Sequence, residues 1–399
     1  MAAMLDLNDA TLPPDPTGGW STAIKSVPNA VVNHLQRGYL VHSSGIFDAD
    51  GGYVPEGVLW RGRAMMVPPP MPETPEYQPG RWLWGGKLLN HFGHFLIEST
   101  GRLWALDHVQ GQLDGIVFIP EGPMTGADQA AELKGFQRLF FDLLGITLPI
   151  KVLTKPTRFE HLEVPGQGFG IGPLGGGTDP FRAYIQKNFA IQVQPEGGER
   201  LYISRSELDV SLGGILGEMR LERYLAENGY EVFHPQNHSL TDQIARYKAA
   251  KQVVGLDGSA LHLFAMAGTP EQRVALIKRR SGPAPDGIVR HLRGFTGQRP
   301  LVLDTITHNW VRSDRKHADN FSYGELDFAR LGKQLSRNGF VPAGVSWRAL
   351  SAARAAAAMQ GIEEKMPGKK HSFNAVPVPE PAPEKLNERR MARKSQTRD

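Results

Sequence analysis

The sequence predicts an α/β fold in which helices alternate with the strands of a parallel sheet. Short apolar runs and helical stretches alternate through the second half of the chain: 201–205, 218–228, 230–234, 239–249, 252–256, 259–268 and 273–278. Strands separated by helices favour a parallel sheet with right-handed crossovers. With 399 residues and 40% apolar side chains, the chain can bury a sizeable core, and its length favours two domains over one.

The segment from Ser239 to Gly268 is the most informative stretch. Ser239 is a good N-cap with Asp242 in the first turn, and Gln252–Leu256 resembles a buried strand. Asp257-Gly258-Ser259 then turns directly into a second apolar helix. Such a turn leaves backbone N–H groups and a positive helix end at the carboxyl edge of a sheet, where α/β folds hold phosphate-bearing ligands.

The first half is more irregular, with strands and turns expected over residues 29–79. The remaining expected elements are a helix over 87–108, a strand over 115–120, a helix over 127–144 and a strand over 149–153. Residues 165–180 are rich in glycine but match no phosphate-binding fingerprint, so we expect a hinge or loop there.

The expected domain organisation has five parts. They are a disordered leader (1–28), an N-terminal α/β domain (29–180), a C-terminal α/β domain (181–330), a helical segment (331–365) and a disordered basic tail (366–399).

Charge and composition exclude several classes of protein. The net charge of +4 comes from the tail, which has eight Lys or Arg against four Asp or Glu; the other residues balance at 37 each. A basic nucleic-acid-binding face is therefore not expected.

Without cysteine, thiol catalysis and thiolate zinc sites are excluded. No signal peptide or membrane-spanning run is seen, so we expect a cytoplasmic protein.

The densest polar cluster is His91, His94 and Glu98. On a helix, His94 and Glu98 share a face, and a carboxylate beside an imidazole is a sound general base. Three interpretations stay open at this point: a capping or packing role for the histidines, an acid/base pair, and a zinc site with two His and one Glu.

Other polar groups lie near the ends of expected strands. Arg205 follows a strand and could bind a phosphate, or pair with a neighbouring acid on the surface. Asp257 could be the nucleophile of a phosphatase of the haloacid dehalogenase type. Such phosphatases have a second Asp two residues later, where this chain has Ser259. His262 is either a core histidine or a partner of Asp257.

Together these segments resemble glycosyltransferase family 61, often labelled capsular polysaccharide biosynthesis proteins. The resemblance is carried by three ordered elements: Asn90 to Glu98 followed by Arg102-Leu-Trp104, the strand Tyr202-Ile-Ser-Arg205, and the segment Ser239 to Leu261 with Gln243, Ile244 and Val253 to Gly255. Asp257 stands where the family has a turn histidine, and the strand Arg273–Lys278 lacks the usual acidic residue.

The resemblance implies a GT-B architecture, with two Rossmann-like domains facing across a cleft. It makes 29–180 the acceptor-side domain and 181–330 the nucleotide-sugar-binding domain. It also implies inverting transfer of a hexose or pentose from a nucleotide sugar, which we expect to be a UDP-sugar, to a glycan or polysaccharide without an obligatory metal or other cofactor. We expect His94 to be the base, oriented by Glu98, with Asn90 and His91 on the acceptor side. The donor would be held by Arg205, Asp257, Gly258, Ser259 and His262.

Two other classes of function compete with this one. A non-catalytic homologue or adaptor would act through its basic tail, which could contact an anionic membrane at its inner face or an assembly protein. A phosphoester hydrolase with Asp257 as nucleophile is the last alternative.

Overall fold

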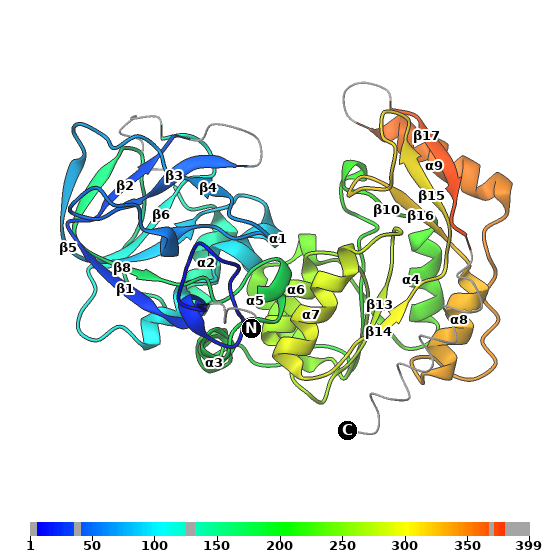
Figure 1. Cartoon of the computed structure of the whole chain (residues 1–399). Helices are drawn as coiled ribbons and strands as arrows, with labels where there is room; N and C mark the ends of the chain where they lie inside the picture. The colour runs from blue at the N-terminus through cyan, green and yellow to red at the C-terminus, as the bar shows by residue number, and fades with distance from the viewer. Residues whose placement is uncertain (1–5, 36–40, 125–131, 367–370, 380–399) are drawn as a thin grey trace, which may run out of the picture. The chain divides into compact units, whose positions relative to one another are not determined.

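The computed structural model describes residues 6–35, 41–124, 132–366 and 371–379 (Figure 1). The chain divides into two compact units. The first comprises Met1–Ile203, Pro235–Val274 and Pro283–Leu301, and the second comprises Ser204–His234, Ala275–Gly282 and Val302–Asp399. In the part of the chain that the structure describes, no helix has both the length and the apolar character needed to cross a bilayer.

The first unit contains an eight-stranded mixed sheet. Its strands are β1 (Ile24–Pro28), β2 (Val31–His34), β3 (His42–Phe47), β4 (Met66–Val67), β5 (Glu76–Lys87), β6 (Gly115–Ile119), β7 (Ile150–Val152) and β8 (Thr157–Pro165). The strand order is β4-β3-β2-β8-β5-β6-β7, with β1 paired to β8. Strands β8, β5, β6 and β7 run parallel, whereas β1 and β2 are antiparallel to β8.

The last six residues of β5, Trp82–Lys87, are all buried, as expected for a parallel strand covered on both faces. The core beside them includes Trp20, Trp60, Trp84 and Phe159. This buried strand ends at Lys87, directly before the segment that carries the predicted catalytic residues, so the core fixes where that segment begins.

Short helices complete the first unit. They are η1 (Gly19–Thr22), η2 (Pro55–Gly57), α1 (Phe92–His94), η3 (Phe95–Ser99), η4 (Leu103–Asp107), α2 (Gly135–Leu143), η5 (Gly172–Gly176), α3 (Asp179–Asn188), η7 (Pro235–Asn237), α5 (Leu240–Ala249), α6 (Ala260–Ala267) and α7 (Ala284–Thr296). Ser239 caps α5, and its hydroxyl and the Asp242 carboxylate form a reciprocal capping box. The predicted start of this helix is confirmed.

A further sheet has five strands in the order β11-β9-β12-β13-β14. Their bounds are β9 (Arg200–Ile203), β11 (Glu231–Phe233), β12 (Gln252–Leu256), β13 (Arg273–Ile277) and β14 (Leu301–Leu303). Strands β9 and β12 are parallel, and α6 follows β12 after a three-residue turn. The α/β class and the strand–turn–helix unit at Asp257 are therefore confirmed.

The second unit has its own four-stranded sheet, in the order β10-β16-β15-β17. Its elements are η6 (Val210–Leu212), β10 (Gly214–Ile215), α4 (Glu218–Ala226), β15 (Ile306–Arg312), β16 (Tyr323–Leu326), α8 (Phe328–Arg337), α9 (Ala352–Lys365) and β17 (Phe373–Pro377). Leu216, Tyr323, Met359 and Phe373 share a small core, which joins the sheet to the alanine-rich helix α9.

Three expectations from the sequence were wrong. The leader 1–28 is not disordered over its described residues 6–28, because η1 and β1 lie in it and Trp20 is 2% exposed. Residues 87–108 do not form one helix: β5 runs to Lys87, and three short helical segments follow, because the Thr100-Gly101 turn separates η3 from η4. The C-terminal segment is not irregular throughout, since β17 pairs with β15. The expected helix over 127–144 is present from Gly135; residues 127–131 lie outside the described residues. The predicted domain boundaries stay predictions.

Candidate active site

The predicted catalytic residues lie on a short, irregular helical segment. Residues Phe92–His94 form one α-helical turn, and Phe95–Ser99 widen into a π-helical turn. Such turns are rare and occur often at functional sites. His91 is the N-cap, because its Nδ1 accepts a hydrogen bond from the His94 amide at 3.4 Å. The contact observed for His91 is therefore that of a helix-capping residue.

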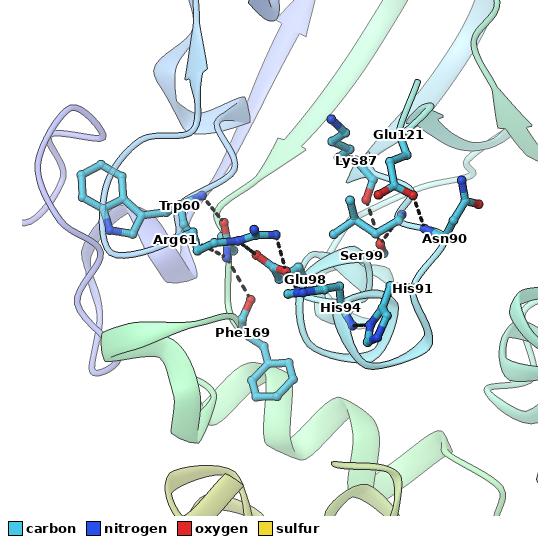
Figure 2. Close-up of polar contacts among 12 residues, drawn as sticks. Trp60, Arg61, Lys87, Asn90, His91, His94, Glu98, Ser99, Glu121 and Phe169 are labelled. Atoms are coloured by element: carbon cyan, nitrogen blue, oxygen red, sulfur yellow. Dashed lines mark hydrogen bonds and ion pairs between the residues drawn. The ribbon is translucent and has the colours of Figure 1, made fainter. Parts of the chain in front are cut away.

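Glu98 is the centre of a charged triad with Arg61 and His94 (Figure 2). Arg61 Nε and Nη2 each donate to one carboxylate oxygen of Glu98 at 2.7 Å. The His94 Nδ1–H donates to Glu98 Oε2, also at 2.7 Å. The Glu98 side chain is fully buried, whereas those of Arg61 and His94 are 30% and 39% exposed.

This geometry selects the tautomer of the neutral imidazole. A carboxylate can only accept, so His94 carries its neutral-form proton on Nδ1 and presents Nε2 as a lone pair. Among the described residues, Nε2 has no hydrogen-bond partner. The bidentate ion pair with Arg61 holds the carboxylate in one orientation. A partly exposed imidazole with a fixed tautomer is equipped to accept a proton from a substrate.

Arg61 is held in place by a buried residue that no local sequence pattern predicts. Gln167 is 1% exposed and forms two hydrogen bonds with the backbone of Trp60. Its Oε1 accepts from the Trp60 amide at 2.8 Å, and its Nε2 donates to the Trp60 carbonyl at 3.1 Å. The same Nε2 donates to the Phe169 carbonyl (Figure 2). Because both the oxygen and the nitrogen of the buried Gln167 amide are hydrogen-bonded, the backbone at Trp60 is restricted, and Arg61 is held in a position to bond Glu98.

The helical segment is also tied to the sheet. Ser99 Oγ donates to the Lys87 carbonyl at 2.8 Å and accepts from the Leu89 amide at 2.9 Å. Arg102 is 3% exposed and donates to the carbonyls of Glu56, Val58 and Pro165. Burial lowers the pKa of Arg102 to about 9. Arg102, part of the resemblance, therefore connects loops here and does not line the site.

The turn after β12 lies against the catalytic segment. A Cβ built on Gly93 would lie 2.5 Å from Ser259 Oγ. Only glycine permits this approach, which places the first turn of α6 next to His91 and His94. Ser259 is the N-cap of α6, yet its side chain makes no capping hydrogen bond. The amides of Leu261 and His262 bond to the carbonyls of Gly258 and Ser259, so what this turn offers an anionic oxygen is the positive end of the helix dipole.

His262, one turn into α6, pairs with a histidine that sequence reasoning missed. Its Nδ1 lies 2.9 Å from Nδ1 of His291 on α7. His291 is 1% exposed, its ring packs against Phe169 and Phe295, and its Nε2 has no hydrogen-bond partner in the described part of the chain. Burial, and then the electrostatic influence of His94, lowers the pKa of His262 to about 4. Burial also lowers the pKa of His291 well below its ordinary value.

The tautomers of this pair follow from the cost of burying an unsatisfied group. An orphaned buried N–H is rarer than an under-satisfied acceptor. The favoured arrangement therefore has His291 donating its Nδ1–H to His262, which leaves a bare lone pair on His291 Nε2. His262 then carries its own proton on Nε2. It is a neutral hydrogen-bond donor at the start of α6.

The remaining predicted residues fall into two groups. Asn90 and His91 are exposed at the start of the segment, and the Asn90 amide donates to Glu121 Oε2 at 2.7 Å. Asp257 is 2% exposed, a poor position for a nucleophile that must reach a phosphoester. Thus the structure brings Asn90, His91, His94, Glu98, Ser259 and His262 into one neighbourhood of the first unit.

Arg205 belongs to the second unit. Its amide donates to Glu218 Oε1 at 2.7 Å, and its guanidinium donates to the carbonyls of Leu212 and Gly213 at 3.1 and 3.4 Å. In this structure Arg205 thus stabilises the turn at residues 210–213. Among the described residues, no group of three or more His, Asp and Glu side chains is arranged to hold a metal ion.

The fold and this site define a class of protein that is then confirmed by comparison. An α/β chain with a carboxylate-oriented imidazole beside a helix N-terminus fits a glycosyltransferase, and the family model described as glycosyltransferase 61 matches residues 92–274. Across these residues the chain belongs to glycosyltransferase family 61. The matched range contains His94, Glu98, Arg205 and the Asp257 turn. No curated protein was found to match the chain.

Proposed function

We propose that the protein is an inverting glycosyltransferase that transfers a hexose or pentose from a UDP-sugar to a hydroxyl of a glycan or polysaccharide. The observation that carries this proposal is the hydrogen bond from His94 Nδ1 to the buried Glu98 carboxylate, which leaves Nε2 as an acceptor. Membership of family 61 supports the class of reaction.

The proposed chemistry needs a single displacement. The acceptor hydroxyl oxygen attacks the anomeric carbon while His94 Nε2 takes the hydroxyl proton, and the bond from that carbon to the diphosphate oxygen breaks. The imidazolium that forms is stabilised by Glu98, whose charge is held in place by Arg61. Attack from the face opposite the leaving group inverts the anomeric configuration.

The leaving diphosphate needs positive groups and aligned N–H donors. The N-terminus of α6 with Gly258 and Ser259, the neutral donor His262, and Arg205 are the groups that we propose for this role. Two facing Rossmann-like domains of the GT-B type would supply such an arrangement. The reaction as proposed requires no metal, because these donors take over the stabilisation of charge.

The setting of the reaction is also proposed. We infer a cytoplasmic enzyme that acts in the assembly of a surface polysaccharide such as a capsule. The eight basic residues of the segment 366–399 would favour contact with the anionic inner face of the membrane.

A direct test begins with donor binding. The purified full chain is screened by thermal unfolding against UDP-, GDP- and dTDP-sugars and the corresponding nucleoside diphosphates. A ligand at one hundred times its Kd adds about 2.7 kcal/mol to the free energy of unfolding. The donors that stabilise the protein are then incubated with glycan acceptors, and the anomeric configuration of the product is read by NMR. A stable product that retains the donor configuration would contradict the inverting mechanism.

A further inference from the structure

A second cluster of polar groups lies beside the triad, at the ends of strands β5, β6 and β2. Lys87 is the last residue of β5, Glu121 follows β6, and His34 ends β2. His34 Nε2 bonds to the Gly122 carbonyl at 3.0 Å, which brings the end of β2 to the end of β6. Figure 2 shows Lys87 and Glu121 close to the segment that carries Glu98 and His94.

The cluster is notable for polar atoms that lack partners. Lys87 is 3% exposed, yet its ammonium forms no hydrogen bond or ion pair with any described residue. His34 Nδ1, His42 Nδ1 and Ser44 Oγ are buried and have no hydrogen-bond partner among the residues that the structure describes. Leaving buried polar groups unsatisfied is costly, and several at one place need an explanation.

Charge interactions confirm that these groups share one environment. Burial lowers the pKa of Lys87 to about 8, and the positive charge of Arg61 acts in the same direction. The carboxylates of Glu121 and Glu98 act in the opposite direction, because they attract the ammonium. Burial and then Lys87 lower the pKa of His34 to about 4, and His42 contributes in the same direction. Near neutral pH the cluster therefore has a charged Lys87 and a neutral His34.

The chemistry of the atoms selects the ligand. His34 Nε2 donates to the Gly122 carbonyl, so Nδ1 of the neutral ring is an acceptor that needs a donor. An ionised carboxylate or a phosphodiester has no hydrogen to give to Nδ1. A sugar hydroxyl can donate to His34 or Glu121 and accept from Lys87 with the same oxygen.

From this juxtaposition we propose an acceptor subsite, formed by Lys87, Glu121, His34, His42 and Ser44, that binds neighbouring hydroxyls of an uncharged sugar. The proposal rests on the proposed function, since it gives the acceptor sugar a place next to His94. The polar atoms that lack partners would then form their hydrogen bonds with the sugar hydroxyls when the substrate binds.

The test uses the full chain and ligand-detected NMR with glucose, galactose, mannose, xylose, glucuronate and inorganic phosphate. At least one neutral sugar should bind saturably, and Lys87→Met should weaken its binding at least tenfold. The matched control is Lys151→Met on β7, since Lys151 Nζ bonds to Gln78 and lies outside the cluster. This control should bind the same sugar with unchanged affinity.

Stability separates a binding role for Lys87 from a structural one. The Lys87 ammonium forms no hydrogen bond or ion pair with a described residue, so its removal should leave the Tm of Lys87→Met unchanged or raise it. A Tm lowered by several degrees, equal sugar affinity of Lys87→Met and wild type, tighter binding of phosphate or glucuronate than of any neutral sugar, or no sugar binding would each overturn the subsite.

The subsite and the proposed function can fail separately. Nucleotide-sugar binding by thermal unfolding is measured on the same variants, and Lys87→Met should retain it. A protein that binds a neutral sugar through Lys87 but no nucleotide sugar would refute the transferase proposal and leave the subsite standing. Donor binding with a Lys87-independent acceptor KM would refute the subsite alone.

Discussion

Gly93 and Ser259 are in contact so close that a Cβ on the glycine would lie 2.5 Å from the serine hydroxyl oxygen. This contact joins the segment with His94 and Glu98 to the start of α6. The relative positions of the proposed base and the proposed phosphate-binding turn therefore depend on the absence of one side chain.

Adding that side chain gives the first prediction. Gly93→Ala should force the two segments apart at a cost of about 1–3 kcal/mol in stability, as overpacking does. It should reduce transfer activity even though alanine favours a helix. Ser259→Gly removes both the Oγ and the Cβ that a new methyl group would meet.

The double variant Gly93→Ala/Ser259→Gly should therefore regain most of the stability lost by Gly93→Ala. Stability is followed by chemical denaturation in a double-mutant cycle. Additive losses in the double variant would contradict the contact.

The second prediction concerns Glu98. Glu98→Gln keeps the size of the side chain but leaves Arg61 without its counter-ion and no longer fixes the His94 tautomer. We expect kcat to fall by about 10²–10⁴-fold, the range of general-base catalysis, with donor KM little changed. Steady-state transfer kinetics measure both.

Glu163→Gln is the matched control for Glu98→Gln. Glu163 is 3% exposed and accepts from Arg81 Nε at 2.8 Å and from Ser26. It is thus a second buried carboxylate paired with an arginine, outside the triad. Equal losses of kcat in both variants would show that Glu98 contributes to structure alone.

Stability should depend on pH through the buried histidines. The pKa values of His34 and His262 are about 4 in the folded state against 6.5 ordinarily, so the unfolded chain binds more protons between these values. The free energy of unfolding should therefore fall as pH decreases from 6.5 toward 4, by roughly 1.4 kcal/mol per pH unit for each such group. Urea denaturation at pH 6.5, 6.0, 5.5 and 5.0 measures this slope.

His291→Phe should make the slope shallower, because it removes one buried histidine whose pKa is depressed. His161→Phe is the control, since His161 is exposed on β8. A slope that is the same in wild type and His291→Phe would disprove the contribution of His291.

Arg205 supplies a prediction for the second unit. If it meets the diphosphate, Arg205→Ala should raise donor KM at least tenfold or abolish turnover, through loss of charge-assisted hydrogen bonds. Arg205→Lys keeps the charge and should lose less. Because Arg205 also donates to the Leu212 and Gly213 carbonyls, Tm is recorded for both variants. Donor kinetics that match wild type would remove Arg205 from the site.

Truncation tests whether the C-terminal segment carries the function. A chain that ends after Pro379 keeps β17 and the bond from the Val378 amide to the Thr307 carbonyl. It should keep its Tm and its transfer to a soluble acceptor. A chain that ends after Met366 loses β17 and the buried Phe373, and its Tm should fall. Absence of transfer by both the full chain and this shorter chain, with a partner that binds only the full chain, would support the adaptor function.

Local patterns predicted much of this structure. The Ser239 cap, strand β12 and helix α6 depend on residues next to each other in the chain, so their start and end positions were readable. The pairing of His94 with Glu98 was readable for the same reason. The single helix expected over 87–108 failed because apolar residues at helical spacing can equally follow a buried strand and short turns.

The residues that support the site were not predictable in this way. Arg61 and Glu98 are 37 positions apart, Gln167 and Trp60 are 107 apart, and His262 and His291 are 29 apart. Such pairings depend on tertiary packing and have no periodic pattern in the sequence. Lys87 likewise gave no signal, because its burial follows from the neighbouring ends of strands β5 and β6.

The central claim is that His94 accepts the proton of the acceptor hydroxyl. It is tested most directly by the transfer rate of His94→Ala with and without added imidazole, with donor binding measured in parallel. The account predicts at least a hundredfold loss of kcat, unchanged donor binding, and partial restoration by imidazole. Turnover of His94→Ala at the wild-type rate would contradict it.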